Sequence, residues 1–139
     1  MNATVHSLTP KGLKDLALNG ASNYRLVDDQ VDFYASEIIN NRSRDNTSGT
    51  LSLELWALPM PYQGGDFSGI PLAGREFGTL QGQHSLRNLT HSQRTQLPGE
   101  GEWYLVLMLR EYTGNGYVTR DYMNYPETLK AAYKLALSL

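Results

Sequence analysis

Five acidic residues lie on segments that alternate apolar and polar side chains and are therefore expected to be strands: Glu54, Glu76, Glu102, Glu111 and Asp121. Two carboxyl groups that face each other across a cleft can hydrolyse a glycosidic bond. Nothing in the spacing of these five residues shows that two of them face each other, and outward-facing acids often keep strand edges from aggregating. We therefore expect no catalytic residues and predict that the chain is not an enzyme.

Metal-binding chemistry has little support in the spacing of possible ligands. The chain has three histidines, His6, His84 and His91. They lack the close spacing of zinc ligands. Asp28, Asp29 and Asp32 form an acidic cluster beside a predicted strand, and oxygen-rich loops can hold calcium in secreted sandwich domains. No EF-hand spacing accompanies them, so a solvated turn is favoured over a calcium site, and no cofactor is predicted.

Aromatic residues are the best candidates for ligand binding. Rings on loops and strand ends can stack on sugars or anchor a protein interface. The residues of this kind are Tyr62, Phe67, Tyr117, Tyr122 and Tyr125. We predict Tyr62, Phe67 and Tyr117 as ligand-binding residues. Packing between neighbouring strands, where tyrosine is common, is the favoured alternative role.

The longest apolar run, WYLVLMLREY at residues 103–112, determines how these candidates are positioned. It lies between a Pro- and Gly-containing segment and the turn sequence TGNG. A run of this length between turns is typical of a central strand that is buried on both faces. Gly101, three residues before Tyr104, also matches the tyrosine corner of sandwich folds, in which the hydroxyl bonds to upstream backbone.

Alternating patterns predict the remaining strands. They lie at residues 24–27, 31–39, 50–57, 75–80, 83–89 and 117–125. The adjacent Ile38 and Ile39 interrupt the alternation and predict a β-bulge. Clustered prolines and glycines in residues 58–74 predict a long connection that is either functional or mobile.

The chain is predicted to form one domain with two flanking segments. Residues 1–22 are expected to be irregular or an edge strand, and residues 23–125 to form the sandwich. Residues 126–139, PETLKAAYKLALSL, are expected to be a helical tail or linker, because proline suits the first helical turn and good helix formers follow it. About seven strands with turns every eight to twelve residues predict an all-β antiparallel sandwich, with a lipocalin-like barrel as the alternative.

Composition excludes several classes of protein. With 40% hydrophobic and 19% charged residues, the 139-residue chain is neither disordered nor membrane-embedded. A net charge of -2 provides no basic surface for nucleic acid. The absence of cysteine excludes disulfides and thiolate chemistry. The N-terminal MNATVHSLTPK has no basic segment followed by an apolar one, so neither a signal peptide nor membrane insertion is predicted.

Four segments follow a spaced pattern: ASEIIN at 35–40, SGTLSLELWA at 48–57, Gly78-Thr79-Leu80 with Gly82, and GEWYLVLML at 101–109. Together they resemble the immunoglobulin-like cell-adhesion-related domain of bacterial surface and secreted proteins. The resemblance covers about residues 31–125, and the long Pro/Gly insert after Trp56 and the helical tail depart from the pattern. It implies an immunoglobulin-like sandwich, an extracellular or cell-surface location, and an adhesion or spacer role without catalytic residues.

The predicted function is therefore a non-enzymatic interaction or spacer module with a protein or glycan partner. A carbohydrate-binding module that uses Tyr62 and Phe67 is the alternative, and a small hydrolase is less favoured. A strip of exposed aromatic rings would favour sugar binding, whereas two close carboxyl groups in a cleft would favour hydrolysis. Pairing of two copies through an edge strand is also compatible with the pattern.

Overall fold

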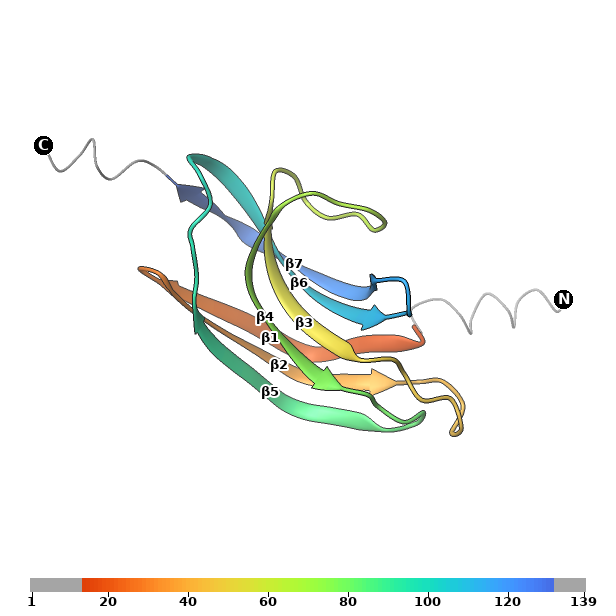
Figure 1. Ribbon diagram of the computed structural model, residues 1–139. Coiled ribbons are helices and arrows are strands. Elements are labelled where there is room, and N and C mark those ends of the chain that lie inside the picture. Colours follow the sequence, from red (N-terminus) through yellow and green to blue (C-terminus); the bar gives the residue numbers. More distant parts are fainter. Residues whose placement is uncertain (1–13, 132–139) are drawn as a thin grey trace, which may run out of the picture.

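A computed structural model describes residues 14–131, which form seven β-strands (Figure 1). The strands are β1 (Leu16–Val27), β2 (Gln30–Asn40), β3 (Leu51–Leu58), β4 (Ile70–Gly78), β5 (Ser85–Arg94), β6 (Gly101–Tyr112) and β7 (Tyr117–Ala131). Nothing in this part of the chain forms a helix of the length and apolarity that crossing a membrane requires.

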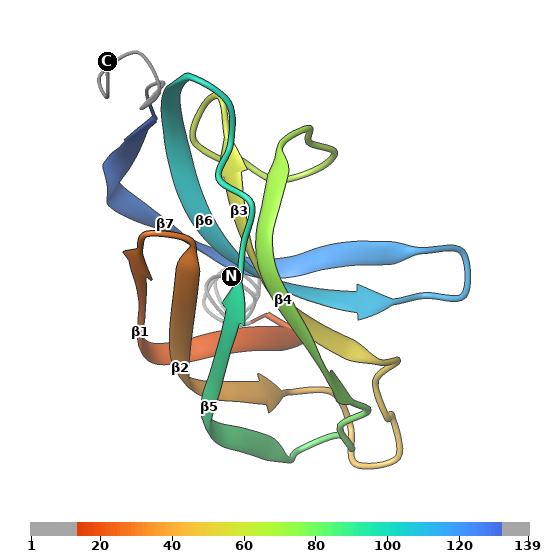
Figure 2. The same ribbon diagram turned by 60° about the vertical axis from the view of Figure 1, so that its left-hand side comes forward.

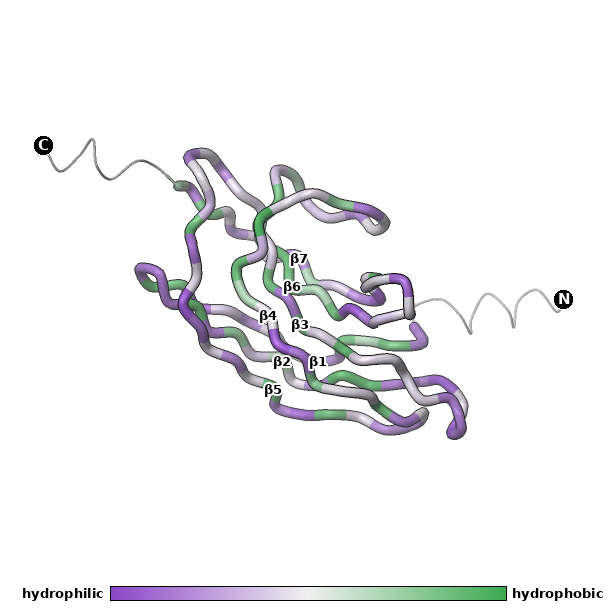
Figure 3. The backbone as a smooth tube through the Cα atoms, in the orientation of Figure 1, coloured by the Kyte–Doolittle hydropathy of each residue, from purple (hydrophilic) through white to green (hydrophobic). Residues whose placement is uncertain are grey.

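The strands form two antiparallel sheets that pack face to face (Figure 2). One sheet has the order β1-β2-β5, and the other has the order β4-β3-β6-β7. The predicted all-β antiparallel sandwich of seven strands is confirmed. Green, hydrophobic segments lie within the strands and alternate there with purple or white ones, and the tips of most connecting loops are purple or white (Figure 3).

The predicted central strand is β6, which lies between β3 and β7 and is buried on both faces. Leu105, Leu107 and Leu109 join the core between the sheets. Val106 and Met108 belong to a second apolar cluster on the opposite face of the same sheet. Because side chains alternate along a strand, one continuous apolar run supplies both clusters.

The predicted tyrosine corner does not form in the described part of the chain. The Tyr104 hydroxyl has no hydrogen-bond partner among residues 14–131, whereas the neighbouring Trp103 donates from Nε1 to the carbonyl of Gly99 over 2.9 Å. The bond to upstream backbone is therefore made by tryptophan.

The β-bulge predicted at Ile38 and Ile39 does not form. β2 keeps a continuous register with β5 through Ile38 and Ile39, while the register of β1 against β2 shifts between Asn19 and Ser22. Gly20, within that shift, has a φ of 76°. Glycine adopts this conformation without a steric penalty, so the extra residue is accommodated in β1.

The helix predicted from residue 126 onward is wrong for residues 126–131, which continue β7. Leu129 pairs with Trp103 and Ala131 pairs with Gly101. Leu129 also packs against the core, so pairing and burial outweigh the local helix propensity. Residues 132–139 of the predicted tail lie outside the described residues. At the other end, β1 is an edge strand from Leu16 onward, within the segment predicted to be irregular or edge.

A buried asparagine fixes the loop after β2. The Asn40 side chain donates from Nδ2 to the carbonyls of Leu80 and Asn46 over 2.8 and 3.2 Å, and its Oδ1 accepts from the amide of Arg42 over 3.0 Å. One side chain therefore joins the end of β2, the following loop and the segment before β5.

Asn40→Ala should lower the free energy of unfolding by about 1–3 kcal/mol, because the buried Leu80 carbonyl loses its side-chain donor. Urea denaturation measures the change. Asn41→Ala is the matched control, because its amide bonds to the Lys14 carbonyl at the surface, and a loss of less than about 1 kcal/mol is expected. Equal losses in the two variants would contradict this role for Asn40.

Candidate functional site: a groove on the outer face of the four-stranded sheet

The long connection between β3 and β4, residues 59–69, folds back over the outer face of the four-stranded sheet. Tyr62 and Phe67 from this loop pack against Val106 and Met108 of β6. Tyr122 of β7 adds a third ring to the same cluster. The loop predicted to be functional or mobile is therefore attached to the sheet through a small apolar core of its own.

Tyr62 holds this loop in place and is only 5% exposed. Its ring centroid lies 4.6 Å from that of Tyr122 and 5.5 Å from that of Phe67, both in edge-to-face contact. Its hydroxyl donates to the Gly65 carbonyl over 2.7 Å, and the Asn124 amide donates to the Tyr62 carbonyl over 2.9 Å. Tyr62 therefore supports the site from beneath and offers a ligand little surface.

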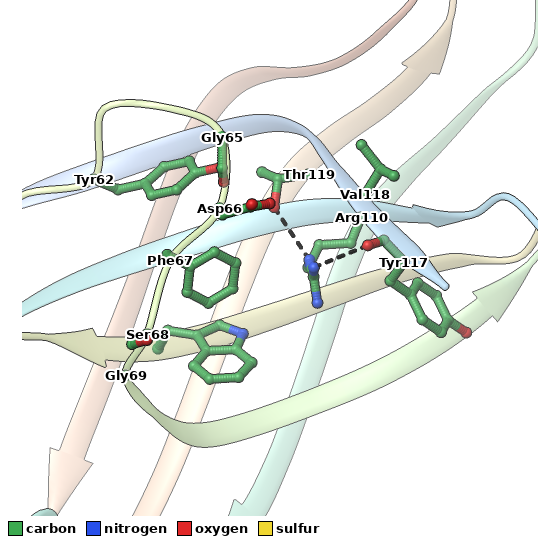
Figure 4. Close-up of a pocket in the computed structure, with 11 residues that line it drawn as sticks. Tyr62, Gly65, Asp66, Phe67, Ser68, Gly69, Arg110, Tyr117, Val118 and Thr119 are labelled. Carbon is green, nitrogen blue, oxygen red and sulfur yellow. Dashed lines mark hydrogen bonds between the residues drawn. The ribbon is translucent and has the colours of Figure 1, made fainter. Parts of the chain in front are cut away.

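A pocket of about 580 Å³ opens beside this loop (Figure 4). The predicted residues Tyr62, Phe67 and Tyr117 all line it. The lining also includes Trp56, Asp66, Arg110 and Thr119. The structure thus brings together all three residues proposed for ligand binding, from a loop and a strand that are far apart in the sequence.

Arg110 lies at the floor of the pocket, where three hydrogen bonds fix its guanidinium. Nε donates to Thr119 Oγ1 over 3.1 Å, one terminal nitrogen donates to the Tyr117 carbonyl over 3.1 Å, and the other to Glu54 Oε1 over 3.2 Å. The guanidinium carbon is also 5.2 Å from the centroid of the Phe67 ring, a cation–π contact. The side chain is 18% exposed, so part of its donor surface still faces the pocket.

Glu54 balances the charge of Arg110. Its Oε1 also accepts from Trp56 Nε1 over 2.9 Å, and its Oε2 accepts from Ser52 Oγ over 2.9 Å. These bonds hold the Trp56 indole, whose ring contacts Phe67 edge-to-face with centroids 4.9 Å apart.

The carboxylate of Asp66, which lines the pocket, has a different environment from that of Glu54. Asp66 is exposed and makes no side-chain hydrogen bond to another residue of 14–131, so its carboxylate is available to a ligand.

A second hollow of about 550 Å³ continues the pocket toward β4. Trp56 and Arg110 line both hollows, and Gly74, Glu76 and Gln93 line only the second. Together the hollows form a groove that crosses the sheet from β7 over β6 and β3 to β4. We call the two parts the β7 compartment and the β4 compartment.

Tyr117 and Glu76 connect the two compartments along one side of the groove. The Tyr117 hydroxyl donates to Glu76 Oε2 over 2.5 Å, although β7 and β4 are the opposite edges of the sheet. This hydrogen bond to the carboxylate, followed by loss of hydration, raises the pKa of Tyr117 to about 12. The tyrosine therefore remains a neutral hydroxyl at physiological pH.

Among the described residues, the acidic residues and histidines that were considered as metal ligands lie apart from the groove. Asp28 and Asp29 form the two-residue turn between β1 and β2, and Asp29 pairs with Arg94 over 2.7 Å. That hydrogen bond lowers the pKa of Asp29. Within residues 14–131 no three His, Asp or Glu side chains are placed to hold a metal ion, and His91 bonds to Gln93. His6 lies outside the described residues.

The sequence did not indicate Arg110 or Gly74 as site residues, and it pointed to Glu54 only as a strand acid considered for catalysis. The available signal was the alternation of β3 and β6, which places polar residues on the same face as Trp56 and Val106. It could show that Glu54 and Arg110 face away from the core, but their contact depends on the register between two strands more than forty residues apart.

Comparisons with models of known protein families, with curated proteins and with solved structures find no match for this chain. The chemistry of the groove is therefore the basis for assigning a function.

Proposed function

We propose that this protein is a non-enzymatic carbohydrate-binding module with an immunoglobulin-like sandwich fold. The observation that carries the proposal is the β7 compartment, where the half-buried rings of Trp56 and Phe67 lie beside the fixed guanidinium of Arg110 and the free carboxylate of Asp66. The ligand-binding alternative from the sequence is thereby favoured over a smooth-surfaced spacer.

The chemistry of the compartment matches that of a sugar. A pyranose ring has an apolar face of C–H groups, which an aromatic ring can cover, and hydroxyls that both donate and accept hydrogen bonds. Arg110 offers donors, Asp66 offers acceptors, and the Thr119 hydroxyl can do both. A pocket of about 580 Å³ is within the usual range for small-molecule sites, roughly 300–1,000 Å³.

The state of the carboxylates supports binding over hydrolysis. Glu54 is ion-paired with Arg110 and accepts bonds from Trp56 and Ser52, while Glu76 accepts the hydroxyl of Tyr117. A general acid must lie within hydrogen-bond reach of the leaving-group oxygen and give it a proton. Both strand carboxylates of the groove are already held by hydrogen bonds from side chains of the protein, which favours a structural role for them.

The strand order supports the immunoglobulin-like part of the proposal. In the constant-type immunoglobulin sandwich, the first, second, fifth and fourth strands form one sheet and the third, sixth and seventh form the other. This chain has the same arrangement, except that β4 pairs with β3. The family resemblance is the source of two further parts of the proposal, a bacterial surface or secreted location and a role in adhesion. Binding to a glycan-coated surface would combine carbohydrate binding with adhesion.

The path of the chain supports spacing as a second candidate function. The start of β1 and the end of β7 lie at opposite ends of the sandwich (Figure 1). A domain with this geometry can be inserted in line between neighbouring segments of a longer chain. Such a role needs no ligand, so it is the function that remains if the groove binds nothing.

A glycan-array screen followed by calorimetry tests the carbohydrate proposal. Wild type should bind at least one glycan, and Phe67→Leu and Asp66→Ala should each weaken binding at least about tenfold, because one removes the aromatic face and the other an acceptor. Tyr24→Leu removes an aromatic ring on the other sheet and should bind like wild type. Absence of binding by the folded protein, or equal loss in Tyr24→Leu, would overturn the proposal.

A further inference from the structure

The two compartments of the groove point to a more specific ligand, and this inference rests on the proposed carbohydrate function. We infer that the groove binds an uncharged, linear oligosaccharide lying across the strands, with sugar units in both the β7 and the β4 compartment. Trp56 and Arg110 contact the chain at the point where the compartments meet.

The size and continuity of the groove carry the first part of this inference. The compartments measure about 580 and 550 Å³, and each alone is as large as a small-molecule site. Both are lined by Trp56 and Arg110, so they adjoin each other on the outer face of the sheet. The Tyr117–Glu76 hydrogen bond supplies a wall that passes from one compartment to the other. A single monosaccharide would leave one compartment empty, whereas a chain fills both.

The polar groups of the β4 compartment are also suited to a polyol. The Gln93 side chain accepts from the backbone amide of Gly74 over 3.1 Å and thereby lines the floor beside β4. Arg75 and Glu76 are exposed at its rim. One Arg75 terminal nitrogen donates to the Thr90 carbonyl over 2.9 Å, and one Glu76 oxygen accepts from Tyr117. The remaining N–H groups of Arg75 and the second carboxylate oxygen of Glu76 provide donors and an acceptor for hydroxyl groups.

The charges along the groove indicate an uncharged ligand. Three carboxylates line it, Glu54, Glu76 and Asp66, against two guanidiniums, Arg75 and Arg110. The ion pair with Glu54 already neutralises Arg110. An anionic chain would therefore meet the unpaired Asp66 without a free cation beside it in the β7 compartment.

Gly74 allows the β4 compartment to be blocked without removing any side chain. It lies opposite Glu54 in the strand register, and a Cβ built there is 3.4 Å from Glu54 Cγ, an ordinary contact distance. Valine suits an extended strand and would project into the compartment. Gly74→Val should therefore fold and melt at or above the wild-type temperature.

The test measures binding of cello-, xylo- and malto-oligosaccharides of two and six units by calorimetry, with a hexameric oligogalacturonide as the charged probe. Wild type should bind the hexamer of one neutral series at least about tenfold more tightly than its dimer, and more tightly than the charged hexamer. In Gly74→Val the ratio of hexamer affinity to dimer affinity should fall close to one. In Tyr24→Leu this ratio should be the same as in wild type.

Each other outcome overturns the inference. Equal affinity of wild type for dimer and hexamer would show that one compartment suffices, and an unchanged ratio in Gly74→Val would exclude the β4 compartment. Tighter binding of the charged hexamer would exclude the uncharged class. These results would leave the proposed carbohydrate function standing, whereas failure to bind any glycan would remove both.

Discussion

Replacing Glu111 with glutamine should lower the free energy of unfolding by about 3–5 kcal/mol at neutral pH, the loss expected when one partner of a buried ion pair is removed. Glu111 accepts two hydrogen bonds of 2.9 Å from Arg42, one of 2.9 Å from Arg120 and one of 2.8 Å from the amide of Gly49. The Glu111 side chain is 6% exposed and that of Arg42 is 15% exposed. Glutamine leaves the largely buried Arg42 with only Asp15 as a carboxylate partner, and Asp15 is 3.8 Å away with a side chain that is 79% exposed.

Glu102→Gln is the matched control, because Glu102 lies at the surface of the same strand, where it accepts a bond from Thr128. Its free energy of unfolding should stay within about 0.5 kcal/mol of wild type in urea denaturation. A similarly small effect of Glu111→Gln would show that the ion network contributes little to stability.

The same network makes stability dependent on acid. Hydrogen bonds from Arg42, and then from Gly49 and Arg120, lower the pKa of Glu111 from 4.5 to about 2 in the folded protein. Because the folded pKa lies below the unfolded one, the contribution is complete above about pH 4.5 and is lost as the pH falls toward 2. The difference in stability between wild type and Glu111→Gln should therefore narrow between pH 5 and pH 2 by on the order of 3 kcal/mol. A difference that stays constant over this range would contradict the assigned cause.

Leu53→Ala should lower the free energy of unfolding by about 2–5 kcal/mol. Leu53 is 0% exposed, lies opposite Leu109 in the central strand pair and belongs to the main core between the sheets. Truncation removes apolar contacts and leaves a cavity that the close-packed sheets cannot fill. Val27→Ala, at an exposed position of β1, is the control, and both variants are measured by urea denaturation. If Leu53→Ala and Val27→Ala unfold at the same urea concentration, Leu53 does not belong to the core.

Those parts of the fold that depend on local pattern could be predicted from the sequence. Strict alternation marks β3, and a long apolar run marks β6 as the strand with two buried faces. The start of β4 could not be found, because Pro71 lies within it and proline usually ends a strand. β4 is an edge strand, where the missing amide of Pro71 is tolerated.

The end of β7 shows the opposite error. Residues 126–131 have good helix propensity, yet pairing with the first residues of β6 and packing of Leu129 determine the outcome. Propensity is a local preference of a few tenths of a kcal/mol per residue, so tertiary contacts readily exceed it. Predicting this strand would have required the register of the β6–β7 hairpin over its whole length.

The candidate site was only partly predictable for the same reason. Aromatic rings in a Pro- and Gly-rich loop and after a turn suggested Tyr62, Phe67 and Tyr117, and all three line one pocket. The sequence could not distinguish the supporting Tyr62, which is buried, from the half-buried Phe67. A mutation of Tyr62 would disturb the loop itself, so Phe67 and Asp66 are the sharper probes of binding.

The most direct measurement follows the two tryptophan side chains by NMR. Trp56 Nε1–H bonds to Glu54 inside the groove, whereas Trp103 Nε1–H bonds to the carbonyl of Gly99 outside it. Titration of the ¹⁵N-labelled protein with the tightest-binding neutral hexasaccharide should shift the Trp56 indole resonance and leave that of Trp103 in place. A shift of Trp103 alone, or of neither indole at saturating ligand, would contradict a carbohydrate site in this groove.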